Sequence, residues 1–115
     1  MKMSYALYER QGEIGVVTLN RPERLNAISG DLLAAFSQSL KDAVADDECS
    51  VIVVRGEGRA FCSGDDLKEF GIQSTNEASI KAHITAIQEI THLMMGSDKP
   101  IVGAIHGFAV GGGFE

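Results

Sequence analysis

Residues 108–115 read Phe-Ala-Val-Gly-Gly-Gly-Phe-Glu, and this glycine triplet is the most informative stretch of the chain. Three adjacent glycines weaken any regular element, but they let the backbone pass close to a partner with its N–H groups unshielded. Glu115 follows two residues after the last glycine. Backbone donors beside a carboxylate suit chemistry at a carbonyl, because the donors hold an oxyanion while the acid moves protons. The stretch therefore predicts one part of an active site.

A second glycine loop occupies residues 58–68, which read Gly-Arg-Ala-Phe-Cys-Ser-Gly-Asp-Asp-Leu-Lys. Gly64 could leave the N–H of Asp65 exposed, and Asp66 could begin a helical turn whose free N–H groups point at whatever lies ahead of it. A glycine followed by two acids is also the ordinary sequence of a turn with a helix cap, and this alternative stays open.

Hydrophobic periodicity predicts a mixed sequence of strands and helices. Alternating apolar residues indicate strands at 5–9 and 14–19, joined by a turn at Gln11 and Gly12. Ser29 is expected to cap a helix that continues to about residue 45, and a second helix should run from about residue 76 to about residue 96.

Two short apolar runs, at residues 50–55 and 101–105, predict strands buried on both faces. The resulting order, β-β-α-β-loop-α-β, is typical of a layered α/β fold. A helix, an apolar strand and a glycine loop occur in that order twice, at residues 31–64 and 78–113. This approximate repeat predicts that the two loops reach the same edge of one sheet.

Composition excludes several classes of function. The 115 residues carry a net charge of −6 with a pI near 5.0, which argues against a nucleic-acid-binding surface. No apolar run has the length of a membrane span, and the N-terminus lacks the apolar region of a secretory signal. Cys49 and Cys62 are expected to be reduced thiols rather than a disulfide, which predicts a cytoplasmic location. Histidines at positions 83, 92 and 106 form no zinc motif, so no metal is expected.

Four segments together resemble the N-terminal portion of the enoyl-CoA hydratase/isomerase superfamily, also called the crotonase family. They occur in the family's order and cover almost the whole chain: Leu-Asn-Arg-Pro-Glu-Arg-Leu-Asn-Ala at 19–27, Val-Val-Arg-Gly at 53–56, Arg-Ala-Phe-Cys-Ser-Gly-Asp-Asp-Leu at 59–67, and residues 99–115. The resemblance implies an α/β crotonase fold, a ClpP-like spiral of repeated β-β-α units. Residues 1–115 would form the N-terminal part of that domain, truncated after the second glycine loop.

The resemblance also implies an activity and a division of catalytic roles. In the family, the two loops supply two backbone N–H groups that hold the thioester oxygen of an acyl-CoA, and the matching donors here are Asp65 and Gly112. The Asp65 carboxylate would then have to turn away from the anion, for example to cap the following turn. Glu115 aligns with one of the two glutamates that hydratases use on water, and the second lies beyond residue 115.

The implied reaction is the hydration of a trans-2-enoyl-CoA, a lyase step of fatty acid metabolism. The resemblance implies no tightly bound cofactor, coenzyme A as part of the substrate, and a parent protein that forms trimers or hexamers. Isomerase chemistry and a non-catalytic acyl-CoA-binding remnant remain alternatives, as does membership of a longer enzyme.

Coenzyme A would contact the segment after the second strand and the first glycine loop. The residues implied are Arg24, Leu25, Ala27, Cys62, Gly64, Asp66 and Lys68. Arg24 and Lys68 are candidates to meet phosphate charge, with solvated surface cations as the alternative. Cys62 is expected to be a small packed residue rather than a nucleophile, and the histidines are expected to be structural or exposed.

Overall fold

The computed structural model describes residues 4–66 and 77–113 of the chain, and a four-stranded sheet organises them. Two helices and two short 3-10 turns accompany the sheet. In chain order the elements are β1 (Ala6–Gln11), β2 (Ile14–Leu19), η1 (Pro22–Arg24), α1 (Gly30–Ala45), β3 (Val51–Gly56), α3 (Glu77–Met95), β4 (Ile101–Ala104) and η2 (Gly111–Gly113). These bounds confirm the predicted order of strands and helices.

The strands follow one another across the sheet in the order β1-β2-β3-β4. β1 and β2 form an antiparallel hairpin, in which Ala6 lies opposite Leu19. Gly12 makes the turn with a φ of +63°, a left-handed conformation that glycine adopts without steric cost. β2, β3 and β4 are parallel, so their carboxyl ends and the loops that follow reach one edge of the sheet.

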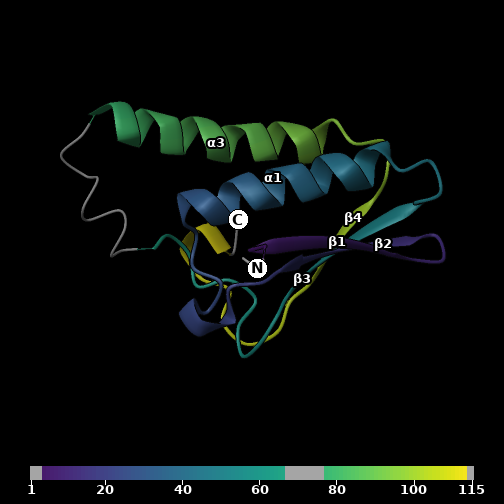
Figure 1. Cartoon of the computed structure of the whole chain (residues 1–115), viewed down its shortest axis with the longest axis horizontal. Helices are drawn as coiled ribbons and strands as arrows, with labels where there is room; N and C mark the ends of the chain where they lie inside the picture. Colours follow the sequence, from purple (N-terminus) through teal and green to yellow (C-terminus); the bar gives the residue numbers. More distant parts are fainter. Residues whose placement is uncertain (1–3, 67–76, 114–115) are drawn as a thin grey trace.

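Both helices cover the same face of the sheet (Figure 1). Val17 and Ile52 point into this layer and are fully buried, together with Leu40 on α1. Fully burying an aliphatic side chain of this size contributes about 1.5–3 kcal/mol, so this layer supplies much of the stability of the described part. Among the described residues, no helix is long and apolar enough to span a lipid bilayer.

The opposite face of the sheet is only partly covered in the described part of the chain. Along β3, Ile52 and Val54 are buried, whereas the alternating residues Val51, Val53 and Arg55 are half-buried. Val102 on β4 is 51% exposed and Leu7 on β1 is 44% exposed. The prediction that β3 and β4 are buried on both faces is therefore wrong for these residues, because α1 and α3 pack on one side only.

Specific contacts fix both ends of α1. Ser29 is the N-cap, as predicted, and its hydroxyl oxygen accepts a hydrogen bond from the Leu32 N–H at 3.1 Å. At the other end, Lys99 Nζ donates to the carbonyl oxygens of Ala43 at 2.8 Å and Asp46 at 2.6 Å. A cation here also complements the negative end of the helix dipole.

Candidate active site

The two glycine loops lie side by side beyond the carboxyl ends of β3 and β4. Cys62 N–H donates to the Phe108 carbonyl at 3.0 Å, and Val110 N–H donates to the Cys62 carbonyl at 3.1 Å. Cys62 and Ala109 thus form a short parallel bridge. The loops meet through their backbones, which agrees with the prediction that both reach the same edge of the sheet.

Two glycines allow this close approach. Gly64 has a φ of +94°, and a β-carbon there would lie 2.7 Å from the Val110 carbonyl oxygen. A β-carbon on Gly113 would collide with the backbone carbonyl of Cys62. Any larger residue at either position would push the loops apart, so the sequence Ser-Gly-Asp and the glycine triplet act as one packed unit.

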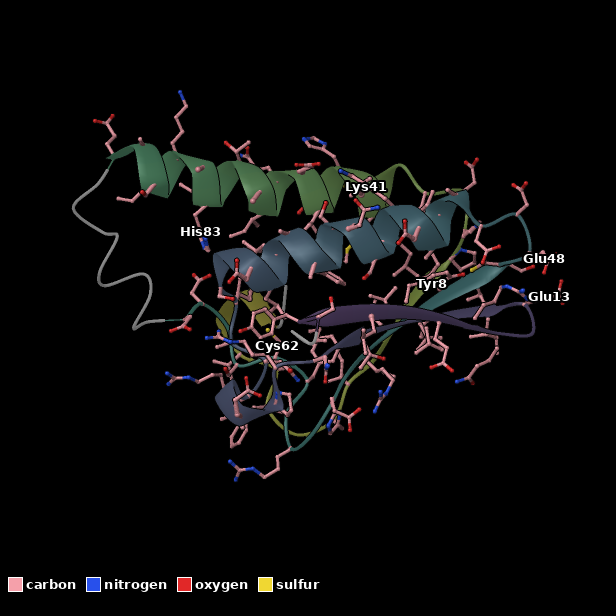
Figure 2. The ribbon with its side chains drawn as sticks, viewed as in Figure 1. Tyr8, Glu13, Lys41, Glu48, Cys62 and His83 are labelled. Atoms are coloured by element: carbon pink, nitrogen blue, oxygen red, sulfur yellow. The ribbon has the colours of Figure 1, made fainter. Side chains whose placement is uncertain are left out.

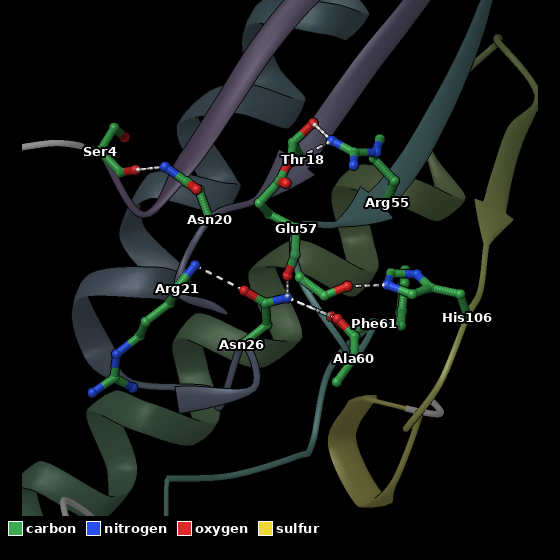
Figure 3. A network of polar contacts seen from close by, with 11 residues as sticks. Ser4, Thr18, Asn20, Arg21, Asn26, Arg55, Glu57, Ala60, Phe61 and His106 are labelled. Atoms are coloured by element: carbon green, nitrogen blue, oxygen red, sulfur yellow. Dashed lines mark hydrogen bonds and ion pairs between the residues drawn. The ribbon is translucent and has the colours of Figure 1, made fainter. Parts of the chain in front are cut away.

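Asn26 fastens the segment after β2 to the first loop (Figure 3). Its side-chain amide donates to the carbonyl oxygens of Glu57, Ala60 and Phe61 at 2.9–3.1 Å, and its Oδ1 accepts from the Arg21 N–H at 2.7 Å. Asn26 is fully buried and has a φ of +54°. Sequence reasoning placed this residue within a family motif but gave it no role.

A backbone bridge orients the amide of Asp65. Ile28 N–H donates to the Gly64 carbonyl at 2.7 Å, and Asp66 N–H donates to the Ile28 carbonyl at 2.8 Å. In such a parallel bridge the residue between the two bonded ones directs its own N–H to the other side. Within residues 4–66 and 77–113, neither the Asp65 N–H nor the Gly112 N–H has a protein acceptor.

Asp65, Gly112 and Gly113 line one cavity of about 440 Å³. The rest of the lining is largely apolar and comes from α1, α3 and the sheet, including Ile28, Leu32, Phe36, Ile87, Ile90 and Ile101. An apolar cavity with a few polar groups at one point is typical of a small-molecule site. The cavity therefore brings together the two residues whose amides the sequence singled out.

The side chain of Asp65 contacts His83 on α3. His83 Nε2 lies 3.2 Å from Asp65 Oδ1, and the His83 side chain is 16% exposed. Figure 2 shows the ring projecting from α3 on the side of the helix that faces α1 and the sheet. Sequence reasoning missed this contact, although His83 precedes Ile87 by four residues and so shares a helix face with a cavity-lining residue.

The residues proposed to contact coenzyme A occupy different environments. Arg24 is exposed at the end of η1. The Leu25 carbonyl accepts from the Ser63 N–H at 3.0 Å, and the Ala27 carbonyl accepts from Arg21 Nη1 at 3.1 Å. The first contact places Leu25 directly against the first loop, whereas the second joins Ala27 to Arg21 within the segment after β2. Lys68 and Glu115 lie outside the described residues.

Arg21 and Asp66 form an ion pair of 2.8 Å between two side chains that are mostly buried. The Arg21 guanidinium also lies 5.7 Å from the centroid of the Tyr5 ring. Through this ion pair, Asp66 joins the first glycine loop to the segment after β2. The sequence analysis assigned no role to Arg21, although its position directly before Pro22 in the family motif could have singled it out.

Cys62 is buried between the loops and lines the cavity. Its thiol donates to the Asn26 carbonyl at 3.1 Å. Burial raises the pKa of the Cys62 thiol, so the nucleophilic thiolate is disfavoured. This supports a packed residue rather than a nucleophile. Among the described residues, no group of three His, Cys, Asp or Glu side chains could hold a metal ion.

Comparison with known proteins places this geometry in a family. The family model for enoyl-CoA hydratase/isomerase matches residues 9–115. A probable mitochondrial enoyl-CoA hydratase of Dictyostelium discoideum is 34% identical over 107 residues, which are 93% of this chain and 37% of that protein. A peroxisomal Delta(3,5)-Delta(2,4)-dienoyl-CoA isomerase of Arabidopsis thaliana is 33% identical over 84% of this chain and 38% of its own length.

The fold comparison agrees. The crystal structure of an enoyl-CoA hydratase from Thermoplasma volcanium superposes with a TM-score of 0.90 at 32% identity, over 98% of this chain and 44% of that one. The chain thus has the α/β architecture of the N-terminal part of the crotonase fold, and it spans about two fifths of the length of these relatives. The sequence motifs, the fold and the family model all agree, and the chain belongs to the enoyl-CoA hydratase/isomerase family.

Proposed function

We propose that this protein is an enoyl-CoA hydratase and that residues 1–115 form the N-terminal part of its crotonase-fold domain. The observation that carries the proposal is the shared cavity of Asp65 and Gly112, which come from two loops locked together through their backbones. The hydratase relatives and the family model support the same activity.

The two amides would act on the thioester oxygen of the substrate. Water addition to an α,β-unsaturated thioester builds negative charge on that oxygen. Two N–H groups already aimed at it stabilise the transition state without reorganising, and removing one such donor typically lowers kcat by about 10²–10³-fold. The largely apolar lining strengthens this electrostatic effect, because it lowers the local dielectric constant.

Proton transfer would involve Glu115 and a second acid. Glu115 would orient or deprotonate the attacking water, and a glutamate beyond residue 115 would handle the proton at the α-carbon. A general base must lie within hydrogen-bond reach of the proton it removes. Only Phe114 separates Gly113 from Glu115, so the carboxylate is close to the Gly112 donor along the chain, which favours this role.

Coenzyme A would lie along the segment after β2 and the first loop. Arg24 is the cation we assign to a phosphate, because it is exposed at the end of η1 within this segment, and Lys68 is a second candidate. The remaining contacts to coenzyme A would come from Leu25, Ala27, Cys62, Gly64 and Asp66. Coenzyme A is then part of the substrate, with no tightly bound cofactor and no metal.

Two other functions stay as alternatives. The similarity to a dienoyl-CoA isomerase favours isomerase chemistry on the same thioester scaffold. A non-catalytic acyl-CoA-binding protein would retain the coenzyme A segments without the second acid. The position of Glu115 favours the hydratase. A trimeric or hexameric assembly belongs to the proposal, and so does a cytoplasmic location, which the free thiols of Cys49 and Cys62 favour. Some relatives are named as mitochondrial or peroxisomal proteins.

Turnover of crotonyl-CoA by the complete gene product tests the proposal. Hydration removes the conjugated double bond, so we expect the absorbance of the enoyl thioester to fall. A parallel assay with a 3-enoyl-CoA detects isomerase activity through the appearance of that absorbance. Purified residues 1–115, with a mass of 12.3 kDa, supply one of the two acids and should not hydrate crotonyl-CoA. Hydration by that fragment, or a complete gene product that neither binds nor converts acyl-CoA, would contradict the proposal.

A further inference from the structure

Asp65 carries two groups with opposite effects on an anion in the cavity. Under the proposed function its N–H stabilises negative charge on the thioester oxygen, whereas its carboxylate is itself negative. The carboxylate is close to the second donor as well, because Asp65 Oδ1 lies 4.0 Å from the point that a β-carbon of Gly112 would occupy. A like charge so near a developing anion raises the energy of the transition state unless it is held away or compensated.

His83 contacts the Asp65 carboxylate and can offset its negative charge. It lies in the second turn of α3, and its Nε2 is 3.2 Å from Asp65 Oδ1. An ionised carboxylate can only accept hydrogen bonds, so Nε2 carries the hydrogen and donates it. The Asp65 side chain is 42% exposed and would be able to rotate, whereas the His83 side chain is largely enclosed at 16%. The contact therefore fixes the more mobile group against the more rigid one.

We propose that His83 is a positioning residue, which holds the Asp65 carboxylate against α3 and compensates, through its donated hydrogen bond, the negative charge of Oδ1 beside the cavity. This inference rests on the proposed function of the Asp65 amide. Its effect belongs to the transition state, where the charge on the oxygen is largest, and less to substrate binding, where the oxygen is nearly neutral. The expected signature is a loss in kcat at nearly constant KM.

The test is a double-mutant cycle on the complete gene product with crotonyl-CoA. We expect His83→Ala to lower kcat about tenfold with KM changed less than about twofold. His83→Gln retains an N–H donor and should lose clearly less than His83→Ala. In an Asp65→Ala background the carboxylate is absent, so adding His83→Ala should change kcat by less than about twofold.

A matched control and a second measurement complete the design. His92→Ala removes an exposed histidine from the same helix and should leave kcat and KM unchanged. A 3-oxoacyl-CoA forms an enolate that absorbs near-ultraviolet light, so its bound spectrum reports stabilisation of the oxyanion independently of turnover. We expect His83→Ala to reduce this absorbance when Asp65 is present and to leave it unchanged in the Asp65→Ala background.

The outcomes separate this inference from the function on which it rests. Equal losses from His83→Ala in both backgrounds, or a raised KM with unchanged kcat, overturn the role of His83 alone. Equal losses in His83→Gln and His83→Ala do the same. If the unaltered protein neither turns over crotonyl-CoA nor forms a bound enolate, the proposed function is wrong and the inference falls with it.

Discussion

The side-chain amide of Asn26 donates to the backbone carbonyl of Ala60 at 2.9 Å, across 34 positions of the chain. This bond and its two neighbours to Glu57 and Phe61 join the segment after β2 to the first glycine loop (Figure 3). A buried carbonyl without a partner costs about 1–3 kcal/mol, so the Asn26 side chain adds substantially to the backbone bonds that hold this loop.

We therefore expect Asn26→Ala to lower the free energy of unfolding by about 3 kcal/mol, because it leaves buried carbonyls unpaired and keeps a non-glycine residue at positive φ. Urea denaturation of the complete gene product measures the change. Asn20→Ala is the matched control, since the Asn20 side chain makes one exposed hydrogen bond to the Ser4 carbonyl and should cost less than about 1 kcal/mol. Equal losses in the two variants would contradict the role given to Asn26.

Gly113→Ala should separate the two loops, because the added β-carbon would meet the Cys62 carbonyl. We expect a loss of about 2 kcal/mol in stability and a fall in kcat/KM of more than about tenfold, since relief of the clash moves the loops. Gly12→Ala is the control: its β-carbon meets nothing, and only the positive φ opposes it. That variant should lose stability without losing activity, and a similar loss of kcat/KM there would argue against a specific effect at Gly113.

Acid should weaken the fold partly through Asp46. The hydrogen bond from the Tyr8 hydroxyl, at 2.7 Å, holds the pKa of the Asp46 carboxyl below its ordinary value of 3.8. A depressed pKa stabilises the folded state above pH 3.8, and this contribution is lost as the pH falls through the folded-state pKa.

Asp46→Asn cannot ionise, so its urea midpoint should fall less than that of the unaltered protein between about pH 7 and about pH 3. Asp47→Asn, at an exposed neighbouring carboxylate, serves as the comparison. A parallel decline of the unaltered protein and Asp46→Asn would show that the Tyr8 contact does not contribute.

Arg24→Ala should weaken acyl-CoA binding through the loss of one phosphate contact. We expect KM to rise about fivefold with kcat unchanged, because the coenzyme A phosphates lie far from the reacting atoms. The effect should shrink as salt is added, since the arginine is exposed. Lys41→Ala removes the same charge from the α1–α3 surface, where Lys41 pairs with Glu89 (Figure 2), and should leave KM unaltered. An unchanged KM in Arg24→Ala would assign Arg24 to the solvated surface.

Much of the fold could be predicted from local sequence patterns, because these features depend on residues close together in the chain. The Ser29 cap, the helical spacing of α1 and the hairpin turn at Gly12 depend on near neighbours, and the structure confirms all three. The apolar runs of β3 and β4 were misread as buried on both faces. An apolar run shows that a strand is suited to burial, but it does not show which elements cover it.

The site was predictable only in part, for the same reason. The glycines mark where loops can approach, and the structure brings Asp65 and Gly112 to one cavity. Among the described residues, the Asp65 carboxylate contacts His83, from a helix 18 positions away, whereas the turn expected after Asp66 lies outside them. Leucine rarely adopts positive φ, so the left-handed pair Leu25 and Asn26 gave no signal in the sequence.

The backbone pairing of Cys62 with Ala109 also limits how sequences of this kind can diverge. Main-chain bonds fix the spacing of the two loops, so exchanging side chains elsewhere cannot easily widen the gap between the Asp65 and Gly112 amides. Positions such as Ile87 and Ile90 carry no such restriction and only shape the cavity wall. Under the proposed function, mutational drift should therefore alter which acyl chains fit long before it alters the bond that reacts.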